Sequence, residues 1–133
     1  MSISTDDYVA ISDHLARYCW AVDEGDEEGW IRLWTEDGVF TGVTPEPVVG
    51  REALRQIVRM SQASGPGKTR HMVASLACDY QDGNDVVLAR YYNFVTNWAQ
   101  GGRLQVMALC TVLLERAGSG WLIRRNDSTM MLA

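Results

Sequence analysis

The hydrophobic period of the sequence changes once, and this change restricts the possible folds more than any other feature. Before residue 69, apolar residues recur every three or four positions, as in amphipathic helices. After it come four long segments rich in β-branched and aromatic residues, separated by the short stretches QDGN, AQGG and AGSG. Such short glycine-bearing connections favour hairpins, so we expect an antiparallel meander. Its strands are expected over residues 70–80, 85–98, 103–116 and 120–132.

Three helices are expected before the change of period. The first has a capping-box-like start at Ser4 and should end near Glu24, because Gly25 can take the left-handed conformation that terminates helices. The second should begin at an Asp26 cap. The expected elements are helices over 4–24, 26–38 and 51–64, a short strand over 39–43 and a loop over 44–50.

This order, with helices first and a run of strands after them, is an α+β pattern, in which the helices cover one face of a sheet. The length of 133 residues suits a single domain spanning 1–133. Three helices over one curved sheet leave a pocket between the layers. We expect this pocket to be lined by strand faces and by the carboxyl end of the first helix.

Composition narrows the range of partners. The net charge is -5 and the 12 Lys and Arg residues are scattered, so we expect no nucleic-acid partner. The longest apolar run, 106–114, is too short to cross a bilayer, and no membrane partner is expected. Cys19, Cys78 and Cys110 are an odd number in apolar surroundings, and no signal segment is apparent. We therefore expect reduced, buried cysteines and a cytoplasmic protein.

Motifs for metals, nucleotides and nucleophilic serines are absent from the sequence, including GxGxxG, the P-loop, HExxH, CxxC and GxSxG. The only two histidines, His14 and His71, are far apart, so neither a metal site nor a cofactor is expected. His14 lies at the boundary of the first helix's apolar stripe and is interpreted as a surface or interface residue. What remains is acid–base chemistry by side chains alone.

His71 is the candidate general base. It follows the expected start of a buried strand, and imidazole titrates near neutrality. A carboxylate that holds one ring nitrogen makes such a base more effective. Asp23 is the best choice, because it ends the first helix beside the buried stripe. An aspartate there faces an unfavourable helix dipole, which a protonated His71 would relieve.

Tyr18 is a candidate hydrogen-bond donor on the same helix, although its position on the apolar stripe also suits a plain core residue. Five residues correspond to about 140° of helix rotation. Tyr18 and Asp23 are therefore expected to share a site only if the helix turns or frays before Asp23.

Further candidate substrate contacts lie on the strands. Tyr91, Asn93 and Asn97 fall on one face by alternation, and two amides in an apolar strand suggest polar pocket contacts. Arg124 and Arg125 are expected to point to opposite faces, so at most one faces the pocket. We include Arg125 among the candidates, and the choice between the two stays open.

Three stretches in this order resemble the nuclear transport factor 2-like superfamily. They are ARYCWAVDEGDEEGWIRLWTEDGVF, TRHMVAS and GSGWLIRR. Within the superfamily the chain resembles the SnoaL-like group, which includes scytalone dehydratase, bile acid dehydratase and hexachlorocyclohexane dehydrochlorinase. The resemblance implies a cystatin-like α+β cone, in which a curved antiparallel sheet wraps around helices and encloses a deep apolar pocket.

In the lyases of this group a His-Asp dyad removes a proton from carbon without a metal or organic cofactor, and a tyrosine or basic residue assists. The resemblance places the dyad on Asp23 and His71 and the tyrosine on Tyr18. Two positions depart from the family pattern. The basic residue of the last strand matches Arg124 and Arg125 only loosely, and a tyrosine common on the third long strand is replaced around Cys110.

These features favour a cofactor-independent lyase, a dehydratase, or an isomerase that acts on a small hydrophobic cyclic molecule. One alternative is a non-catalytic ligand-binding or assembly module of the same fold. Another is the small subunit of an aromatic-ring dioxygenase. The segments MVASLAC and VMALCTVLL are apolar on both faces, which predicts a homo-oligomer, either a dimer or a trimer.

Overall fold

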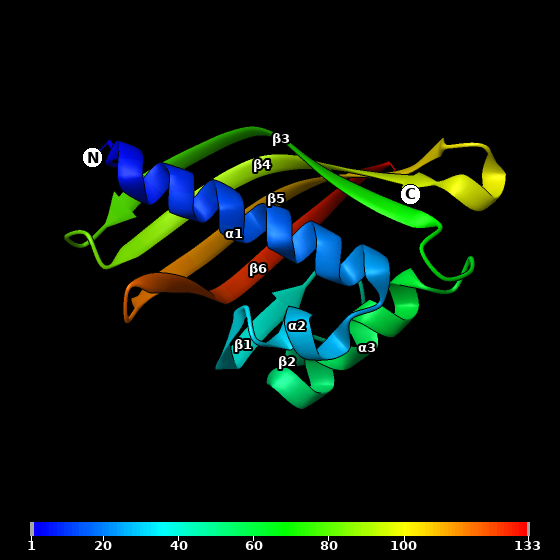
Figure 1. Ribbon diagram of the computed structural model, residues 1–133, viewed down its shortest axis with the longest axis horizontal. Helices are drawn as coiled ribbons and strands as arrows, with labels where there is room; N and C mark the ends of the chain where they lie inside the picture. Colours follow the sequence, from blue (N-terminus) through cyan, green and yellow to red (C-terminus); the bar gives the residue numbers. More distant parts are fainter. Residues whose placement is uncertain (1, 133) are drawn as a thin grey trace.

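The computed structural model describes residues 2–132 and has an α+β architecture, in which three helices pack on one face of a six-stranded sheet (Figure 1). The helices are α1 (Thr5–Glu24), α2 (Glu27–Ile31) and α3 (Arg51–Ser61). The strands are β1 (Trp34–Thr41), β2 (Val48–Val49), β3 (Thr69–Gln81), β4 (Val86–Asn97), β5 (Arg103–Ala117) and β6 (Gly120–Leu132). A single 3₁₀ turn, η1 (Trp98–Gln100), lies between β4 and β5.

The four long strands form the predicted antiparallel meander, and the sheet order is β2-β1-β6-β5-β4-β3. The expectation that the whole sheet is antiparallel is wrong at one pair, since β1 runs parallel to β6. These two strands are separated in the chain by α3 and by four strands, β2, β3, β4 and β5, so no hairpin fixes their relative direction. The sheet is therefore mixed and open, with β3 at one edge.

The first helix has the predicted ends. The Ser4 side chain accepts a hydrogen bond from the Asp7 amide, and Gly25 follows in the left-handed conformation with φ 72°. The second helix is much shorter than predicted. The backbone amide of Ile123 donates to the Leu33 carbonyl, and Trp34 pairs with Ile123 in the sheet. Backbone groups that would form hydrogen bonds within a longer helix instead form hydrogen bonds with β6. The helix therefore ends at Ile31, and β1 begins at Trp34.

Aromatic side chains join the two layers. Trp30 and Trp34 are fully buried with ring centroids 5.2 Å apart, and Tyr18 lies 5.2 Å from Trp30. Phe40 continues the cluster at 6.0 Å from Trp34. The cluster connects α1, α2 and β1, and so fixes the position of Tyr18 relative to the sheet. None of the helices in residues 2–132 is long and apolar enough to span a bilayer.

At the other end of α1, Asp7 joins the helix to two strands. Its carboxylate accepts hydrogen bonds from Arg116, with Nη2 at 2.9 Å, and from the Tyr80 hydroxyl. The Arg116 and Tyr80 hydrogen bonds lower the pKa of Asp7 below its usual 3.8. The ionised carboxylate of Asp7 therefore stabilises the folded protein. This contribution to the free energy of unfolding is complete above pH ~3.8 and is lost as pH falls through the lower pKa that Asp7 has in the folded state.

Replacing Asp7 by asparagine tests this connection. We expect the free energy of unfolding to fall by about 1 kcal/mol at neutral pH, as for a partly exposed charged network. The difference between wild type and variant should shrink as pH drops below the pKa of Asp7. Urea unfolding followed by circular dichroism at several pH values measures this, and a pH-independent difference would contradict it.

Candidate active site

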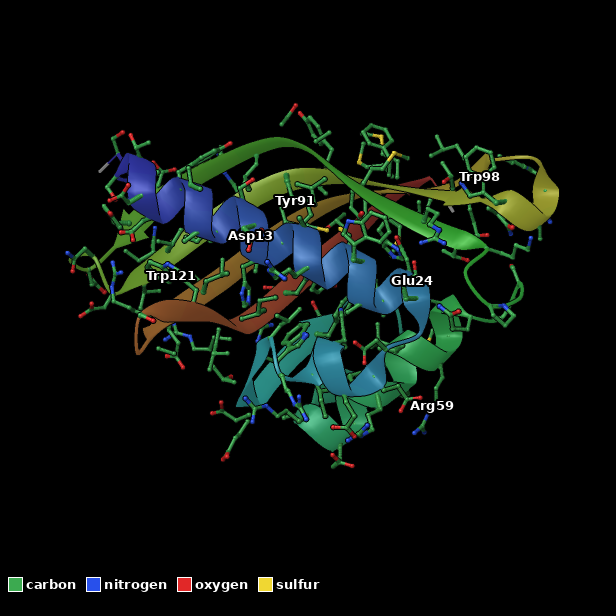
Figure 2. The ribbon with its side chains drawn as sticks, viewed as in Figure 1. Asp13, Glu24, Arg59, Tyr91, Trp98 and Trp121 are labelled. Carbon is green, nitrogen blue, oxygen red and sulfur yellow. The ribbon has the colours of Figure 1, made fainter. Side chains whose placement is uncertain are left out.

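Asp23 near the carboxyl end of α1 and His71 near the start of β3 lie in direct contact. Asp23 Oδ1 lies 2.6 Å from His71 Nδ1, and Asp23 Oδ2 accepts a hydrogen bond of 2.9 Å from the His71 backbone amide. The Asp23 side chain is almost fully buried. The neighbouring residues also pair, because Arg70 Nη1 lies 3.0 Å from Glu24 Oε1, and Figure 2 shows Glu24 at the end of α1. Four side chains thus hold the helix end against the strand.

The position of β3 explains why the His71 backbone amide donates to the Asp23 carboxylate. It is the edge strand, so a backbone amide that points away from β4 has no partner within the sheet. The Asp23 carboxylate satisfies this amide at His71 and holds the imidazole ring at the same time. With a carboxylate on Nδ1, a neutral imidazole carries its proton there and leaves a lone pair on Nε2. His71 Nε2 makes no hydrogen bond to residues 2–132, so it is free to accept a proton.

A cavity of about 350 Å³ lies between α1, α3, the segment after β1 and the inner face of the long strands. His71 and Tyr18 both line it, while Asp23 stands behind His71 and is not part of the lining. Most of the wall is apolar. The apolar lining residues include Val22, Phe40, Ile57, Val95, Val106 and Ala108. His71 also borders a groove of about 420 Å³ between α1 and β3. The groove is also lined by a phenol, Tyr8, but that hydroxyl already donates to the Leu76 carbonyl. The apolar cavity is the better candidate site, because its wall is mostly apolar and its phenol, Tyr18, donates to no residue in the described part of the chain.

Tyr18 offers a neutral donor inside the cavity. Its hydroxyl accepts a hydrogen bond of 3.2 Å from Asn126 Nδ2, and Asn126 Oδ1 accepts one of 3.2 Å from the Ser128 hydroxyl. Burial is the main cause that raises the pKa of Tyr18 well above 10.0, so the phenol stays protonated. Within residues 2–132 its proton has no acceptor and is available to an oxygen in the cavity.

The expected break in α1 is absent. The helix runs without interruption through Asp23 to Glu24, and Asp23 does not itself line the cavity that Tyr18 lines. His71 of β3 connects the two residues, because it contacts Asp23 and lines the same cavity as Tyr18.

The candidate contacts on β4 have different surroundings. Asn93 lines the cavity, and its Oδ1 is buried without a hydrogen-bond partner in the described part of the chain. Tyr91 is a buried residue of β4, where burial is the main cause that raises its pKa well above 10.0, and it is not part of the cavity wall. Asn97 is buried and donates to Ser64 Oγ and to Gln105 Oε1. The structure therefore keeps Asn93 as a candidate contact and gives Asn97 a structural role at the sheet end.

Neither arginine of β6 faces the cavity. The β5–β6 register pairs Leu114 with Ile123 but Leu113 with Arg125, so Arg124 is an extra residue in a bulge. Arg124 and Arg125 are both exposed, and Arg125 binds Asp127 at 2.8 Å. The expectation that they point to opposite faces is wrong, because the bulge interrupts the alternation.

The bulge also decides which polar residues of β6 face inward. Asn126 and Ser128 are buried, and Ser128 lines the cavity. Sequence reasoning missed both, since strict alternation from Ile123 places Arg125 inward and Asn126 outward.

His14 lies outside the cavity wall. Its Nε2 is 3.0 Å from the Leu33 carbonyl, it is partly buried, and burial is the main cause that lowers its pKa below 6.5.

Gly42, which follows β1, is one of the residues that line the cavity, and its backbone lies close to Ser128 of β6. Its φ is +102°, and a Cβ there would lie 1.8 Å from the Ser128 carbonyl oxygen. We expect Gly42→Ala to lower the free energy of unfolding by about 2–3 kcal/mol, through backbone strain and displacement of β6. The matched control is Gly83→Ala, whose φ is +85° with no atom within 4 Å of the added Cβ. Equal losses in the two variants, measured by urea unfolding, would show that the contact with Ser128 has no effect.

Comparisons with known proteins agree with this architecture. A family model described as SnoaL-like domain matches residues 4–127. No curated protein matches the sequence. Within residues 2–132, no three or more His, Cys, Asp or Glu side chains gather as they would around a metal ion.

Several solved structures are similar in fold. A protein from Catenulispora acidiphila, solved in complex with S-DNPA, is 27% identical with a TM-score of 0.79, covering 96% of this chain and 95% of that one. An NTF2-like protein with a cystatin-like fold from Novosphingobium aromaticivorans is 23% identical with a TM-score of 0.81, covering 95% of this chain and 82% of that one. ActVI-ORFA from Streptomyces coelicolor is 18% identical with a TM-score of 0.82, covering 93% and 97%. The chain therefore belongs to the SnoaL-like domain family and has the cystatin-like fold of the NTF2-like proteins.

Proposed function

We propose that this protein is a cofactor-independent lyase (dehydratase) or isomerase that removes a proton from a carbon atom of a small hydrophobic cyclic substrate. The observation that carries the proposal is the 2.6 Å contact between Asp23 Oδ1 and His71 Nδ1 beside an apolar cavity. His71 is the general base, Asp23 orients it, and Tyr18 donates a hydrogen bond to a substrate oxygen. Asn93 is a further polar contact for the substrate.

The proposed reaction starts with proton transfer from a carbon next to a carbonyl group to His71 Nε2. The electron pair of the C–H bond moves toward the carbonyl oxygen, which becomes an enolate and accepts the Tyr18 hydrogen bond. The imidazolium that forms lies against the Asp23 carboxylate. In a dehydratase the proton then passes to a departing hydroxyl group, which leaves as water. In an isomerase it returns to a different carbon of the same molecule.

The size and lining of the cavity support a small organic ligand. A volume of about 350 Å³ is in the range of small-molecule sites, and its mostly apolar wall suits a ring system. The Catenulispora acidiphila relative was solved with S-DNPA bound, which supports a small molecule as the ligand here. The neutral phenol of Tyr18 suits a substrate oxygen that gains negative charge.

Hydrogen exchange of simple cyclic ketones tests the proposed proton transfer without knowledge of the natural substrate. The protein is incubated in D₂O with 2-tetralone and with 2-decalone, and loss of the α-hydrogen signals is followed by NMR. We expect exchange faster than in buffer. Binding of the ketones without accelerated exchange would overturn the catalytic proposal and support a ligand-binding module.

Tyr18→Phe removes the proposed donor and keeps the aromatic ring. We expect the exchange rate to fall by about tenfold to a hundredfold, because the enolate oxygen loses one hydrogen bond. The ketone dissociation constant should change much less, since the bond strengthens as charge develops. Tyr91→Phe is the matched control, because Tyr91 is equally buried but does not line the cavity. Equal rates in Tyr18→Phe and wild type would exclude Tyr18 as the donor.

A further inference from the structure

A row of hydrogen-bonded side chains leads from β5 through β6 to Tyr18 on α1. Cys110 of β5 and Ser128 of β6 are paired residues of the sheet, and Cys110 Sγ lies 3.4 Å from Ser128 Oγ. The Ser128 hydroxyl donates to Asn126 Oδ1 at 3.2 Å, and Asn126 Nδ2 donates to the Tyr18 hydroxyl at 3.2 Å. All four side chains are buried. We call these four residues the Tyr18 network.

The sheet and the first helix together bring the Tyr18 network into place. Asn126 and Ser128 are two positions apart on β6, so their side chains lie on the same face of the sheet. The bulge at Arg124 turns this face inward. The helix α1 crosses the inner face (Figure 1), and its buried stripe places Tyr18 next to Asn126. Three separate elements therefore contribute to the surroundings of one phenol.

The number of protons gives the Tyr18 network a single direction. A serine hydroxyl has one proton, and that of Ser128 goes to Asn126 Oδ1. The Cys110 thiol is therefore the donor to Ser128 Oγ. Burial raises the pKa of Cys110 above its usual 9.0, so the thiol keeps the proton that this bond needs. Because the amide oxygen of Asn126 faces Ser128, its NH₂ group faces Tyr18.

This direction decides what the Tyr18 hydroxyl can do. A phenol also has one proton, and Asn126 offers it a donor but no acceptor. The Tyr18 proton is therefore left for a group in the cavity that Tyr18 lines. Hydrogen bonds in a row polarise one another, so the donors before Tyr18 make its hydroxyl a stronger donor. An amide turned the other way would accept the Tyr18 proton and remove this ability.

We propose that Asn126 and Ser128 are positioning residues, which fix the Tyr18 hydroxyl as a hydrogen-bond donor to a substrate oxygen, with Cys110 as the first donor of the row. The inference rests on the proposed function, because it assigns these residues to the proton transfer at His71. The direction of the Tyr18 hydroxyl, however, is a property of the protein alone and can be measured without any substrate.

Asn126→Asp tests the direction, because an ionised carboxylate has two acceptor oxygens and no donor. One oxygen still accepts from Ser128, and the other accepts the Tyr18 proton. We expect the ketone exchange rate to fall to that of Tyr18→Phe, about tenfold to a hundredfold below wild type, while the ketone dissociation constant changes much less. In the double variant with Tyr18→Phe, Asn126→Asp should cause no further loss. A further loss would show that the carboxylate acts through its charge and would overturn the proposal.

NMR of protein labelled with ¹³C at the tyrosine ζ carbons measures the Tyr18 hydroxyl directly. Tyr18→Phe identifies the Tyr18 signal among those of the five tyrosines. In Asn126→Asp we expect this signal to shift toward the position of an ionised phenol, because the hydroxyl then donates to a carboxylate. Asn97→Asp is the matched control, since Asn97 is equally buried but donates to Ser64 and Gln105. It should leave the Tyr18 signal and the exchange rate unchanged.

Ser128→Ala introduces no charge and tests the proposal a second time. It removes the donor that holds Asn126 Oδ1, and we expect the exchange rate to fall by about threefold to tenfold and the Tyr18 signal to move. Circular dichroism checks that the variants fold. A Tyr18 signal that stays unchanged in Asn126→Asp and Ser128→Ala, or that shifts equally in Asn97→Asp, would overturn the proposal. No ketone exchange in the wild type would overturn the proposed reaction instead, while the Tyr18 signal still decides the direction of the hydroxyl.

Discussion

Replacing His71 by glutamine is expected to lower the rate of ketone hydrogen exchange by about 10²–10⁴-fold, the usual contribution of a positioned general base. Glutamine still offers a donor to the Asp23 carboxylate but has no basic nitrogen. The fold should persist, because the hydrogen bond from the backbone amide of residue 71 to Asp23 does not depend on the side chain. Ketone affinity, measured by fluorescence or NMR, should change by much less than the rate.

The chain supplies a matched control, since its only other histidine lies outside the cavity wall. His14→Gln removes an imidazole that contacts the Leu33 carbonyl, and we expect exchange at the wild-type rate. Asp23→Asn keeps the shape of the partner but removes its charge, so the rate should fall while the cavity stays intact. Full activity in His71→Gln would remove His71 from the mechanism. An equal loss in His14→Gln would mean that the assay reports damage to the fold.

Replacing Trp34 by alanine is expected to lower the free energy of unfolding by about 3–5 kcal/mol, because a fully buried indole leaves a large cavity. Trp34 Nε1 has no hydrogen-bond partner within the described residues, so losing this buried polar group offsets part of the cost. The ring lies 6.3 Å from Tyr18 and 6.0 Å from Phe40, and both of these line the cavity. Ketone binding should therefore weaken together with stability.

Trp98→Ala is the control for this substitution. Trp98 is 56% exposed, and its indole nitrogen binds the Thr96 hydroxyl at the surface. We expect its loss to change the free energy of unfolding by less than about 1 kcal/mol. Urea unfolding of both variants gives the comparison. A loss at Trp34 no larger than that at Trp98 would show that the aromatic cluster does not hold the helices on the sheet.

Much of the fold could be predicted from local patterns. The Ser4 cap, the Gly25 terminator and the glycine-bearing connections act within a few residues, so their effects are visible in the sequence. The end of α2 was not predictable in this way. The residues after Ile31 have a helical pattern, but pairing of Trp34 with Ile123 makes them a strand. A partner almost ninety positions away decided the local structure.

In the candidate site, too, some features could be predicted from the local sequence and others depend on contacts between distant segments. His71 and Asp23 could be named from residue type and position, together with the family resemblance, and the structure brings them into contact at 2.6 Å. Arg125 could not be assigned correctly, because a bulge at Arg124 changes which residues of β6 face inward. Asn126 and Ser128 near Tyr18 depend on the same bulge.

The sequence by itself determined the α+β class, the antiparallel meander and the residues able to act as base, carboxylate and donor. These follow from hydrophobic period, turn chemistry and side-chain pKa values, all of which are local. Only the tertiary structure decided the parallel β1–β6 pair, the inward face of β6 and the placement of Asp23 behind His71. These depend on backbone hydrogen bonds between segments far apart in the chain, whose register no local pattern specifies.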